Sequence, residues 1–144
     1  MKTKIVKFDH EVRESIRLGI ETLANAVKTT MGPRGKTVLI ERVGAHPIVT
    51  KDGVTVAKAI NLSDQFQNLG VQVVKDAASR SAEEAGDGTT TATVLTQAIY
   101  EQGLRMISSG QDSVNLRKSI DKAVDDVMKN LKDNSKPIEG RKSL

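Results

Sequence analysis

A short stretch of the sequence brings glycine, a carboxylate and a run of hydroxyl side chains together. Its members are, in order, Gly86, Asp87, Gly88, Thr89, Thr90 and Thr91. Backbone N–H groups at the start of a helix carry partial positive charge and bind anions, and the threonine hydroxyls add further donors. A carboxylate repels phosphate directly, but Mg²⁺ joins one or two carboxylates to nucleotide phosphates. The stretch therefore predicts a phosphate site with Asp87 as a magnesium ligand.

An earlier segment, residues 29–35, has glycines, hydroxyls and a basic residue between a predicted helix and a predicted strand. It contains Thr30, Met31, Gly32 and Pro33. Glycine lets backbone N–H groups approach an anion closely, and consecutive N–H groups can form a nest around phosphate. The segment is therefore a second candidate for phosphate contact, although it lacks the Gly-Lys-Ser/Thr pattern of a P-loop.

A third segment, Lys51-Asp52-Gly53, places a basic and an acidic side chain next to each other in a tight turn. A carboxylate close to phosphate is unfavourable unless a cation or a water molecule lies between them. Asp52 is therefore a candidate only in combination with such a cation or water.

Each of the three segments also has an ordinary structural interpretation. Residues 29–35 fit a helix-to-strand turn, and Asp-Gly pairs are common in tight turns. The third stretch could simply join two helices, with Gly86 at the C′ position and Thr89 as the N-cap. A charge-assisted hydrogen bond contributes about 1.5–3 kcal/mol, so one segment alone would not hold a triphosphate, whereas several converging on one point would.

The three segments lie between elements that the hydrophobic pattern predicts to be mostly helical. Apolar residues that recur every three or four positions predict helices, and Gly and Pro mark their ends. Two β-branched runs on either side of a turn at residues 43–47 predict one β-hairpin, which needs a packing partner to be stable. The predicted elements are helices over residues 9–27, 54–60, 65–85, 89–107 and 113–133, a hairpin over about 37–50, and a strand or arm at 4–8. The predicted fold class is therefore mainly α with one β-hairpin.

Helix caps and apolar faces give further predictions. Asp9 and Asp64 are the expected N-caps of the first and third helices, because an Asp side chain accepts hydrogen bonds from the free N–H groups there. The last helix carries the clearest apolar stripe, from Leu116 to Leu131. The apolar positions assigned to helix 65–85 are Phe66, Leu69, Val73, Val74 and Ala77, and those assigned to helix 89–107 are Val94, Leu95, Ala98, Leu104 and Ile107.

The composition excludes several classes of protein. The 144 residues include no cysteine, which excludes disulfides and thiolate metal sites. No apolar run is long enough for a membrane span or a signal-peptide core. The net charge is +4, but charges of both signs alternate and the aromatic residues are only 2 Phe and 1 Tyr, so base stacking has few candidates. We therefore expect a cytoplasmic protein with neither nucleic acid nor a membrane as a partner.

The three segments, in this order and at these intervals, resemble the start of the bacterial-type (group I) chaperonins, the GroEL family. The resemblance runs from about Val6 to Ile138, and its most specific parts are residues 50–54 and 86–95. It implies the N-terminal half of a chaperonin equatorial domain, which binds ATP and makes most of the ring contacts. Residues 1–136 would form this partial domain, and residues 137–144 would begin a link toward an intermediate domain.

The resemblance also implies a role for each residue of the three segments. The nucleotide contacts are implied at Thr30, Met31, Gly32 and Pro33, and the phosphate-binding turn at Gly88, Thr89, Thr90 and Thr91. Thr30 and Lys51 match residues near a potassium ion, and Asp87 matches the magnesium ligand. Asp52 matches the catalytic carboxylate that helps to position the attacking water. Hydrolysis would then consist mainly of phosphate positioning and charge neutralisation.

The implied function is that of an ATP-dependent folding chaperonin, which works with Mg²⁺ and K⁺ in a ring of like subunits. Family members are several times longer, so the chain is expected to be a fragment that binds ATP weakly and hydrolyses it barely, if at all. Contacts with unfolded clients and a co-chaperonin would lie in domains outside this sequence. The alternative is a short, non-catalytic protein that associates with a full-length chaperonin ring through the 5–8 arm and the 37–50 hairpin.

Overall fold

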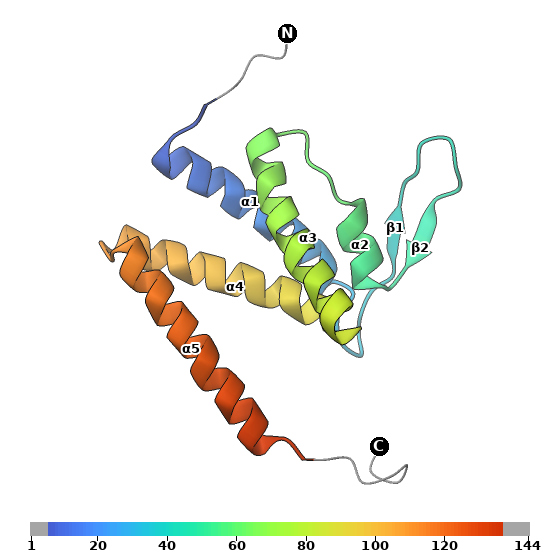
Figure 1. Ribbon diagram of the computed structural model, residues 1–144. Coiled ribbons are helices and arrows are strands. Elements are labelled where there is room, and N and C mark those ends of the chain that lie inside the picture. The colour runs from blue at the N-terminus through green and yellow to red at the C-terminus, as the bar shows by residue number, and fades with distance from the viewer. Residues whose placement is uncertain (1–5, 137–144) are drawn as a thin grey trace. The chain divides into compact units, whose positions relative to one another are not determined.

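The computed structural model describes residues 6–136 as five helices and a two-stranded sheet (Figure 1). The elements are α1 (Asp9–Lys28), β1 (Val38–Ile40), β2 (Ile48–Thr50), α2 (Gly53–Ala59), α3 (Gln65–Ala85), α4 (Thr89–Ser108) and α5 (Ser113–Asn134). These bounds confirm the mainly α fold class and the antiparallel hairpin, in which Leu39 pairs with Val49. The link predicted at 137–144 and the first part of the 4–8 arm lie outside the described residues, and residues 6–8 have no regular secondary structure.

The chain divides into two compact units, one up to Leu104 and one from Arg105. The core of the first unit lies between α1, α2 and α3, with the inner side of the hairpin packed against it. On α1 the core positions are three and four residues apart and so share one face of the helix. The buried apolar residues are Ile20, Leu23 and Val27 from α1, Val56 and Ala57 from α2, and Val71 and Val74 from α3.

The two longest helices of this core, α1 and α3, touch at two glycines. A Cβ atom on Gly19 would collide with the backbone oxygen of Gln67, and a Cβ atom on Gly70 would collide with that of Ile16. Both contacts would be closer than the 3.0 Å that real Cβ atoms respect. A glycine inside a helix is less favourable than alanine by about 1 kcal/mol, so these two positions are explained by the close approach of the backbones.

This crossing determines which face of α3 is buried. The buried residues of α3 are Gly70, Val71, Val74 and Ala78. Of the apolar positions assigned to this helix from the sequence, Leu69 is 53% exposed and Val73 is 49% exposed, so these two lie outside the core. The physical reason is that the contact with α1 is centred on Gly70, which contributes almost nothing to a hydrophobic pattern.

On α4 the apolar positions assigned from the sequence do not form the buried face, because the buried residues on this helix are the polar Thr93 and Gln97, whereas Leu95 is 54% exposed. Burial of these polar groups is tolerated because both are hydrogen-bonded. The Thr93 hydroxyl donates to the carbonyl of Thr89 at 3.0 Å, and Gln97 has two side-chain partners that are described with the site below.

Aspartate side chains cap the first turns of several helices. Asp64 accepts hydrogen bonds at 2.9 Å from the N–H groups of Phe66 and Gln67 at the start of α3, as predicted. Asp112 accepts one at 2.9 Å from the N–H of Asn115 at the start of α5. These bonds satisfy N–H groups that have no partner within the helix.

The prediction that Asp9 caps α1 is wrong. Phe8 occupies the N-cap position, and Asp9 is the first helical residue, with a φ of 45°. Its carboxylate pairs instead with Arg13, one turn along the helix, at 2.8 Å. The helix therefore gains an ion pair along its first turn where a side-chain cap was expected.

The second unit consists of the end of α4 and the helix α5. Its apolar stripe is present as predicted, but none of the residues of α5 is buried. Val124, Val127, Met128 and Leu131 are all at least half exposed. In the part of the chain from residue 6 to residue 136, no helix has both the length and the apolar character needed to cross a membrane.

Candidate functional site

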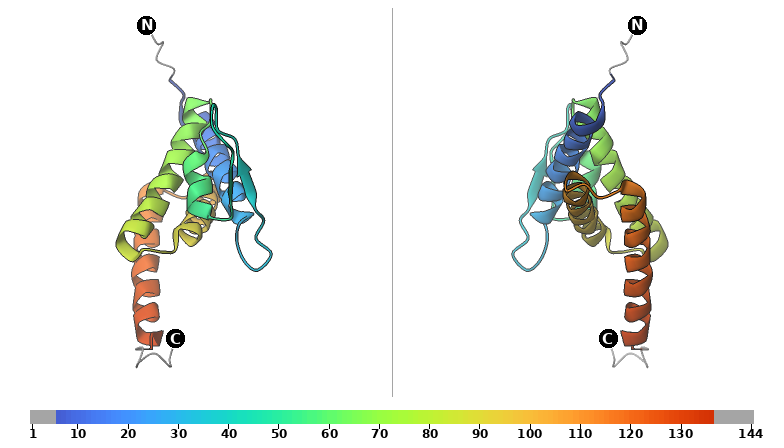
Figure 2. Two further views of the ribbon diagram at one scale, coloured as in Figure 1. Left: turned by 90° about the vertical axis from the view of Figure 1, so that its right-hand side faces the viewer. Right: turned by 90° about the vertical axis from the view of Figure 1, so that its left-hand side faces the viewer.

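The turn after α1 closes the C-terminal end of that helix. The Thr30 hydroxyl donates to the carbonyl of Val27 at 2.7 Å, which satisfies one of the free carbonyls at the helix end. Gly32 has a φ of 73°, a backbone conformation that glycine adopts without strain, and its carbonyl accepts the N–H of Gly35 at 3.0 Å. The other predicted contacts in this turn, Met31 and Pro33, are exposed. The turn projects away from α1 and α2 (Figure 2).

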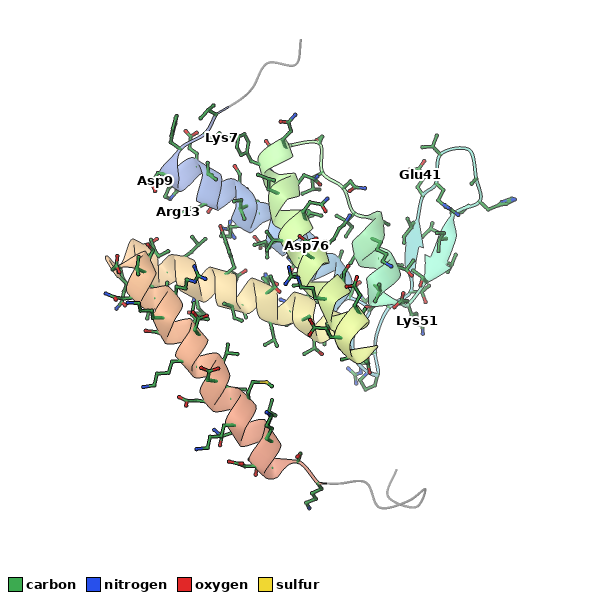
Figure 3. The ribbon with its side chains drawn as sticks, viewed as in Figure 1. Lys7, Asp9, Arg13, Glu41, Lys51 and Asp76 are labelled. Carbon is green, nitrogen blue, oxygen red and sulfur yellow. The ribbon has the colours of Figure 1, made fainter. Side chains whose placement is uncertain are left out.

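The Asp52 carboxylate is the N-cap of α2. It accepts the N–H of Val54 at 3.2 Å, the N–H of Thr55 at 2.9 Å and the hydroxyl of Thr55 at 2.6 Å. This role was not predicted, although an Asp-Gly pair directly before an apolar helix was a sufficient indication. Lys51 is exposed and lies where β2 leads into α2 (Figure 3).

These hydrogen bonds hold the pKa of Asp52 below the ordinary aspartate value, and the largest effect comes from the Thr55 hydroxyl. Partial burial acts in the opposite direction, and the two backbone N–H groups and Lys58 add to the lowering. A carboxylate with a lowered pKa stabilises the fold above its unfolded pKa of about 3.9, and this contribution is lost as the pH falls through the folded pKa. Asp52 therefore stabilises α2 at neutral pH.

Replacement of Thr55 by valine should raise the pKa of Asp52, because valine keeps the shape of threonine but has no hydroxyl to donate. Titration of the carboxyl carbon by NMR measures this pKa directly. Asp64 is the internal control, since its pKa is lowered mainly by the N–H of Gln67 and should not change in the variant. An unchanged Asp52 titration would show that the 2.6 Å contact is not a hydrogen bond of consequence in solution.

The connection between α3 and α4 contains the second predicted carboxylate. Gly86 ends α3 in the left-handed conformation, with a φ of 71°, as predicted for a C-terminal glycine. The Ser81 hydroxyl donates to the backbone carbonyl of Asp87 at 2.7 Å, and a carboxylate oxygen of Asp87 accepts the N–H of Gly88 at 2.6 Å. Asp87 is exposed. Its carboxylate is therefore held close to the start of α4.

The first turn of α4 presents backbone N–H groups. The first hydrogen bond of this helix runs from the N–H of Ala92 to the carbonyl of Gly88 at 2.8 Å. The N–H groups of Thr89, Thr90 and Thr91 precede it and point out of the helix end, where they are available to an anion. The alternative in which Thr89 is the N-cap is wrong, because Thr89 is the first helical residue.

The three segments meet at Gly53, which is buried. A Cβ atom at this position would lie 2.6 Å from the Thr90 hydroxyl oxygen, 3.2 Å from the Thr30 hydroxyl oxygen and 3.2 Å from a methyl carbon of Val27. The absence of a side chain at Gly53 therefore lets two hydroxyl groups from distant parts of the chain face one small space. The carboxylates of Asp52 and Asp87 are not part of this contact and are bound locally, by α2 and by Gly88.

A buried amide joins the last turn of α1 to α4. The ammonium group of Lys28 donates to the side-chain oxygen of Gln97 at 2.6 Å, and the Gln97 amide donates to Glu101 at 2.7 Å. Gln97 is only 6% exposed. Because Lys28 is close to Thr30, this link fixes the turn after α1 relative to α4. Sequence reasoning missed it, since two residues that are 69 positions apart give no local pattern.

The donor types present fit a magnesium-bound phosphate better than a metal held by protein alone. Within residues 6–136, no three His, Cys, Asp or Glu side chains gather into a metal-binding group. The oxygen of the Asp87 carboxylate is a hard ligand of the kind that Mg²⁺ prefers, and Mg²⁺ is usually held by one or two carboxylates together with substrate phosphates.

Comparison with known proteins gives consistent matches. Residues 23–144 match the model of the TCP-1/cpn60 chaperonin family. The chaperonin gp146 from bacteriophage EL 2 (Pseudomonas aeruginosa), crystallised in the presence of ATP-BeFx, is 32% identical with a TM-score of 0.77; the match covers 90% of this chain and 22% of that chain. A group III chaperonin in the open state is 23% identical with a TM-score of 0.78, which shows the fold; it covers 90% of this chain and 25% of that one. The chain thus spans about a quarter or less of each.

Proposed function

Because the chain belongs to the TCP-1/cpn60 chaperonin family, we propose that it supplies part of the ATP-binding site of a folding chaperonin. The observation that carries the proposal is the meeting of three separate segments at Gly53, with the hydroxyls of Thr30 and Thr90 beside it. Segments that converge on one point can together bind a ligand that one segment alone is too weak to hold. We further propose that the chaperonin is of the bacterial (group I) type, on the strength of the motifs at residues 50–54 and 86–95.

In this proposal the three segments divide the tasks of the site between them. The N–H groups at the start of α4 and the hydroxyls of Thr89, Thr90 and Thr91 bind phosphate oxygens. Asp87 holds Mg²⁺, which neutralises charge on the phosphates when bound. Thr30 and Lys51 lie near K⁺, and Met31, Gly32 and Pro33 contact the nucleotide.

Asp52 has capacity left for the attacking water. One of its carboxylate oxygens accepts a single N–H, from Val54, whereas the other accepts both bonds from Thr55. A carboxylate has about four acceptor sites, so the first oxygen can also accept a hydrogen bond from water. Asp52 would then cap α2 and orient water with the same group.

The whole protein is proposed to act as a ring of like subunits that refolds client proteins, with clients and a co-chaperonin bound by domains outside this sequence. The chain spans 22% and 25% of the two chaperonins compared above. We therefore propose that it is a fragment. The isolated chain is expected to bind MgATP weakly, with little or no hydrolysis.

Titration with MgATP tests the proposal. NMR is the suitable method for weak binding, and the amide signals of Gly88, Thr90 and Thr30 should shift saturably. Asp87→Asn keeps the size of the side chain but removes its charge, and should weaken MgATP binding about tenfold, the loss of one charge-assisted contact. The variant is titrated freshly purified with its mass checked, because an Asn-Gly pair can lose ammonia and return Asp.

The matched control is Asp76→Asn, which makes the same change of charge at an exposed position on α3 (Figure 3). This variant should bind MgATP like the parent chain. If Asp76→Asn weakened binding as much as Asp87→Asn, the effect would be one of overall charge, and Asp87 would not be the magnesium ligand. The absence of any saturable shift in the parent chain would contradict the proposed function.

A second candidate function is association with a full-length chaperonin ring. The outer face of the hairpin favours it, because the paired residues Leu39 and Val49 are 68% and 67% exposed side by side. Exposed apolar side chains on a two-stranded sheet are suited to contact with another protein. Co-sedimentation of the chain with an assembled ring tests this candidate, and a chain that stays in the supernatant in every nucleotide state would contradict it.

A further inference from the structure

The chain contains two Asp-Gly pairs, Asp52-Gly53 and Asp87-Gly88, whose surroundings differ. In such pairs the backbone nitrogen of the glycine can attack the side-chain carboxyl group of the aspartate, because glycine has no side chain to hinder the approach. The reaction needs the nitrogen beside the carboxyl group, and a carboxyl group that no other contact holds away from it. The two pairs can therefore be compared within one molecule.

The Asp87 pair meets these requirements. Its carboxylate oxygen lies 2.6 Å from the Gly88 nitrogen, so the two reacting groups are in contact. The hydrogen bond from Ser81 to the Asp87 carbonyl, at 2.7 Å, orients the peptide group between the two residues. Asp87 is exposed and lies between two helices, in the connection from α3 to α4. Contact of reacting groups in a fixed orientation is what raises the rate of an intramolecular reaction.

The Asp52 pair does not meet them. Its carboxylate oxygens are bound by the N–H groups of Val54 and Thr55, which lie beyond the glycine. Gly53 is buried as the first residue of α2, and the Thr90 hydroxyl oxygen lies where a Cβ atom of this residue would collide with it. Ring closure at Asp52 would break the cap and displace Gly53 from this contact.

We propose that Asp87 is a site of spontaneous isoaspartate formation in the folded protein, while the fold protects Asp52. The Gly88 nitrogen forms a bond to Cγ of Asp87 in its carboxylic acid form. The hydroxyl of the acid leaves as water with the amide proton, and a succinimide ring results. Water then adds to the main-chain carbonyl carbon of Asp87, and the bond from this carbon to the Gly88 nitrogen breaks. The product has the composition of the starting chain, but its main chain now runs through Cβ and Cγ of residue 87.

One consequence rests on the proposed function. The main chain between α3 and α4 becomes longer by one methylene group, and the carboxylate is attached directly to Cα of residue 87. Both changes displace the proposed magnesium ligand relative to the first turn of α4. The isomerised chain should therefore lose measurable MgATP binding.

Incubation of the full chain at neutral pH tests the inference, in parallel samples that are folded or unfolded in urea. Peptide mapping with electron-transfer fragmentation locates isoaspartate, and the succinimide is detected as a peptide lighter by one water. In the folded chain we expect isoaspartate at Asp87 and none above background at Asp52. In the chain unfolded in urea we expect isoaspartate at both Asp87 and Asp52. A folded chain in which Asp87 stays as unmodified as Asp52, or in which both are modified equally, would overturn the inference.

Two variants and one ligand complete the test. Asp87→Glu should remove the signal, because the larger ring forms much more slowly, whereas Asp52→Glu should leave the signal at Asp87 unchanged. Isoaspartyl methyltransferase, which methylates isoaspartate, gives an independent measure of the modification. If the Asp87→Glu chain still accepted methyl groups from this enzyme, the isoaspartate would lie elsewhere and the inference would be contradicted. Saturating MgATP should slow the reaction at Asp87 by engaging its carboxylate. Isomerisation that MgATP leaves unaffected would confirm the modification and count against the proposed function alone.

Discussion

Replacement of Gly70 by alanine should lower the free energy of unfolding of the first unit by about 1–3 kcal/mol, the usual penalty for an atom forced into a packed site. The new Cβ would collide with the backbone oxygen of Ile16, and a backbone atom in a helix cannot rotate away as a side chain would. The helices α1 and α3 must therefore separate, and the buried side chains around Ile20 and Val74 lose contact. Urea denaturation followed by circular dichroism measures the change.

The sign of this effect distinguishes packing from helix propensity. At an open helix position, replacement of glycine by alanine stabilises a protein by about 1 kcal/mol. The control is Ala98→Gly at an exposed position inside α4, which should be destabilising by about that amount through propensity alone. A more stable Gly70→Ala chain would mean that the two backbones are not in contact.

The companion substitution Gly19→Ala should have a similar effect, because its Cβ would collide with the backbone oxygen of Gln67 in the same crossing. Once one alanine has separated α1 from α3, the Cβ atom of the second alanine has a smaller steric clash. The double variant should therefore lose less stability than the two single variants together, as is usual for substitutions that share a contact.

Replacement of Gly53 by alanine should weaken MgATP binding about tenfold or more and also lower stability by about 1–3 kcal/mol. The new Cβ would lie 2.6 Å from the Thr90 hydroxyl oxygen and 3.2 Å from that of Thr30. Since these two groups face the space beside Gly53, the methyl group would drive them apart. NMR titration with MgATP gives the affinity, and denaturation of the same samples gives the stability.

A second substitution separates the two effects. Thr90→Ala in the Gly53→Ala chain removes the atom in closest contact, so it should restore most of the lost stability. It should not restore MgATP binding, because a proposed phosphate donor is now missing. Recovery of binding together with stability would show that Thr90 only fills space, and would remove the central observation behind the proposed function.

Local sequence patterns were enough to locate the elements but not the faces along which they pack. The bounds of α3 were predicted correctly, because Asp64 caps its start and Gly86 ends it within a few residues of the periodic pattern. Its buried face could not be predicted in the same way, because that face is fixed by the contact of Gly70 with α1, which involves residues far apart in the sequence. The burial of Gln97 likewise depends on its contact with Lys28, which is 69 positions away in the sequence.

In the candidate site, too, local features could be predicted from the sequence and contacts between distant segments could not. Its three segments could be selected from their residue types, and their conformations at Gly32, Gly86 and Gly88 follow from glycine. Their meeting at Gly53 could not be predicted from the residues alone, since it depends on how α1, α2 and α4 pack. The N-cap role of Asp52 was a local feature and was missed because residues 51–53 were interpreted as a tight turn.

The crossing of α1 and α3 also has a mechanical consequence. A contact made of backbone atoms has no side chain whose rotamer can absorb a displacement, so the two helices share a pivot at Gly19 and Gly70. From this pivot the helix α1 extends about 14 Å to the turn at Thr30, and α3 extends about 22 Å to the connection at Asp87, at 1.5 Å per residue. A rotation of α1 relative to α3 would therefore take place about this contact. A small rotation at the crossing would be amplified into larger movements of these two turns, both of which belong to the proposed ATP site.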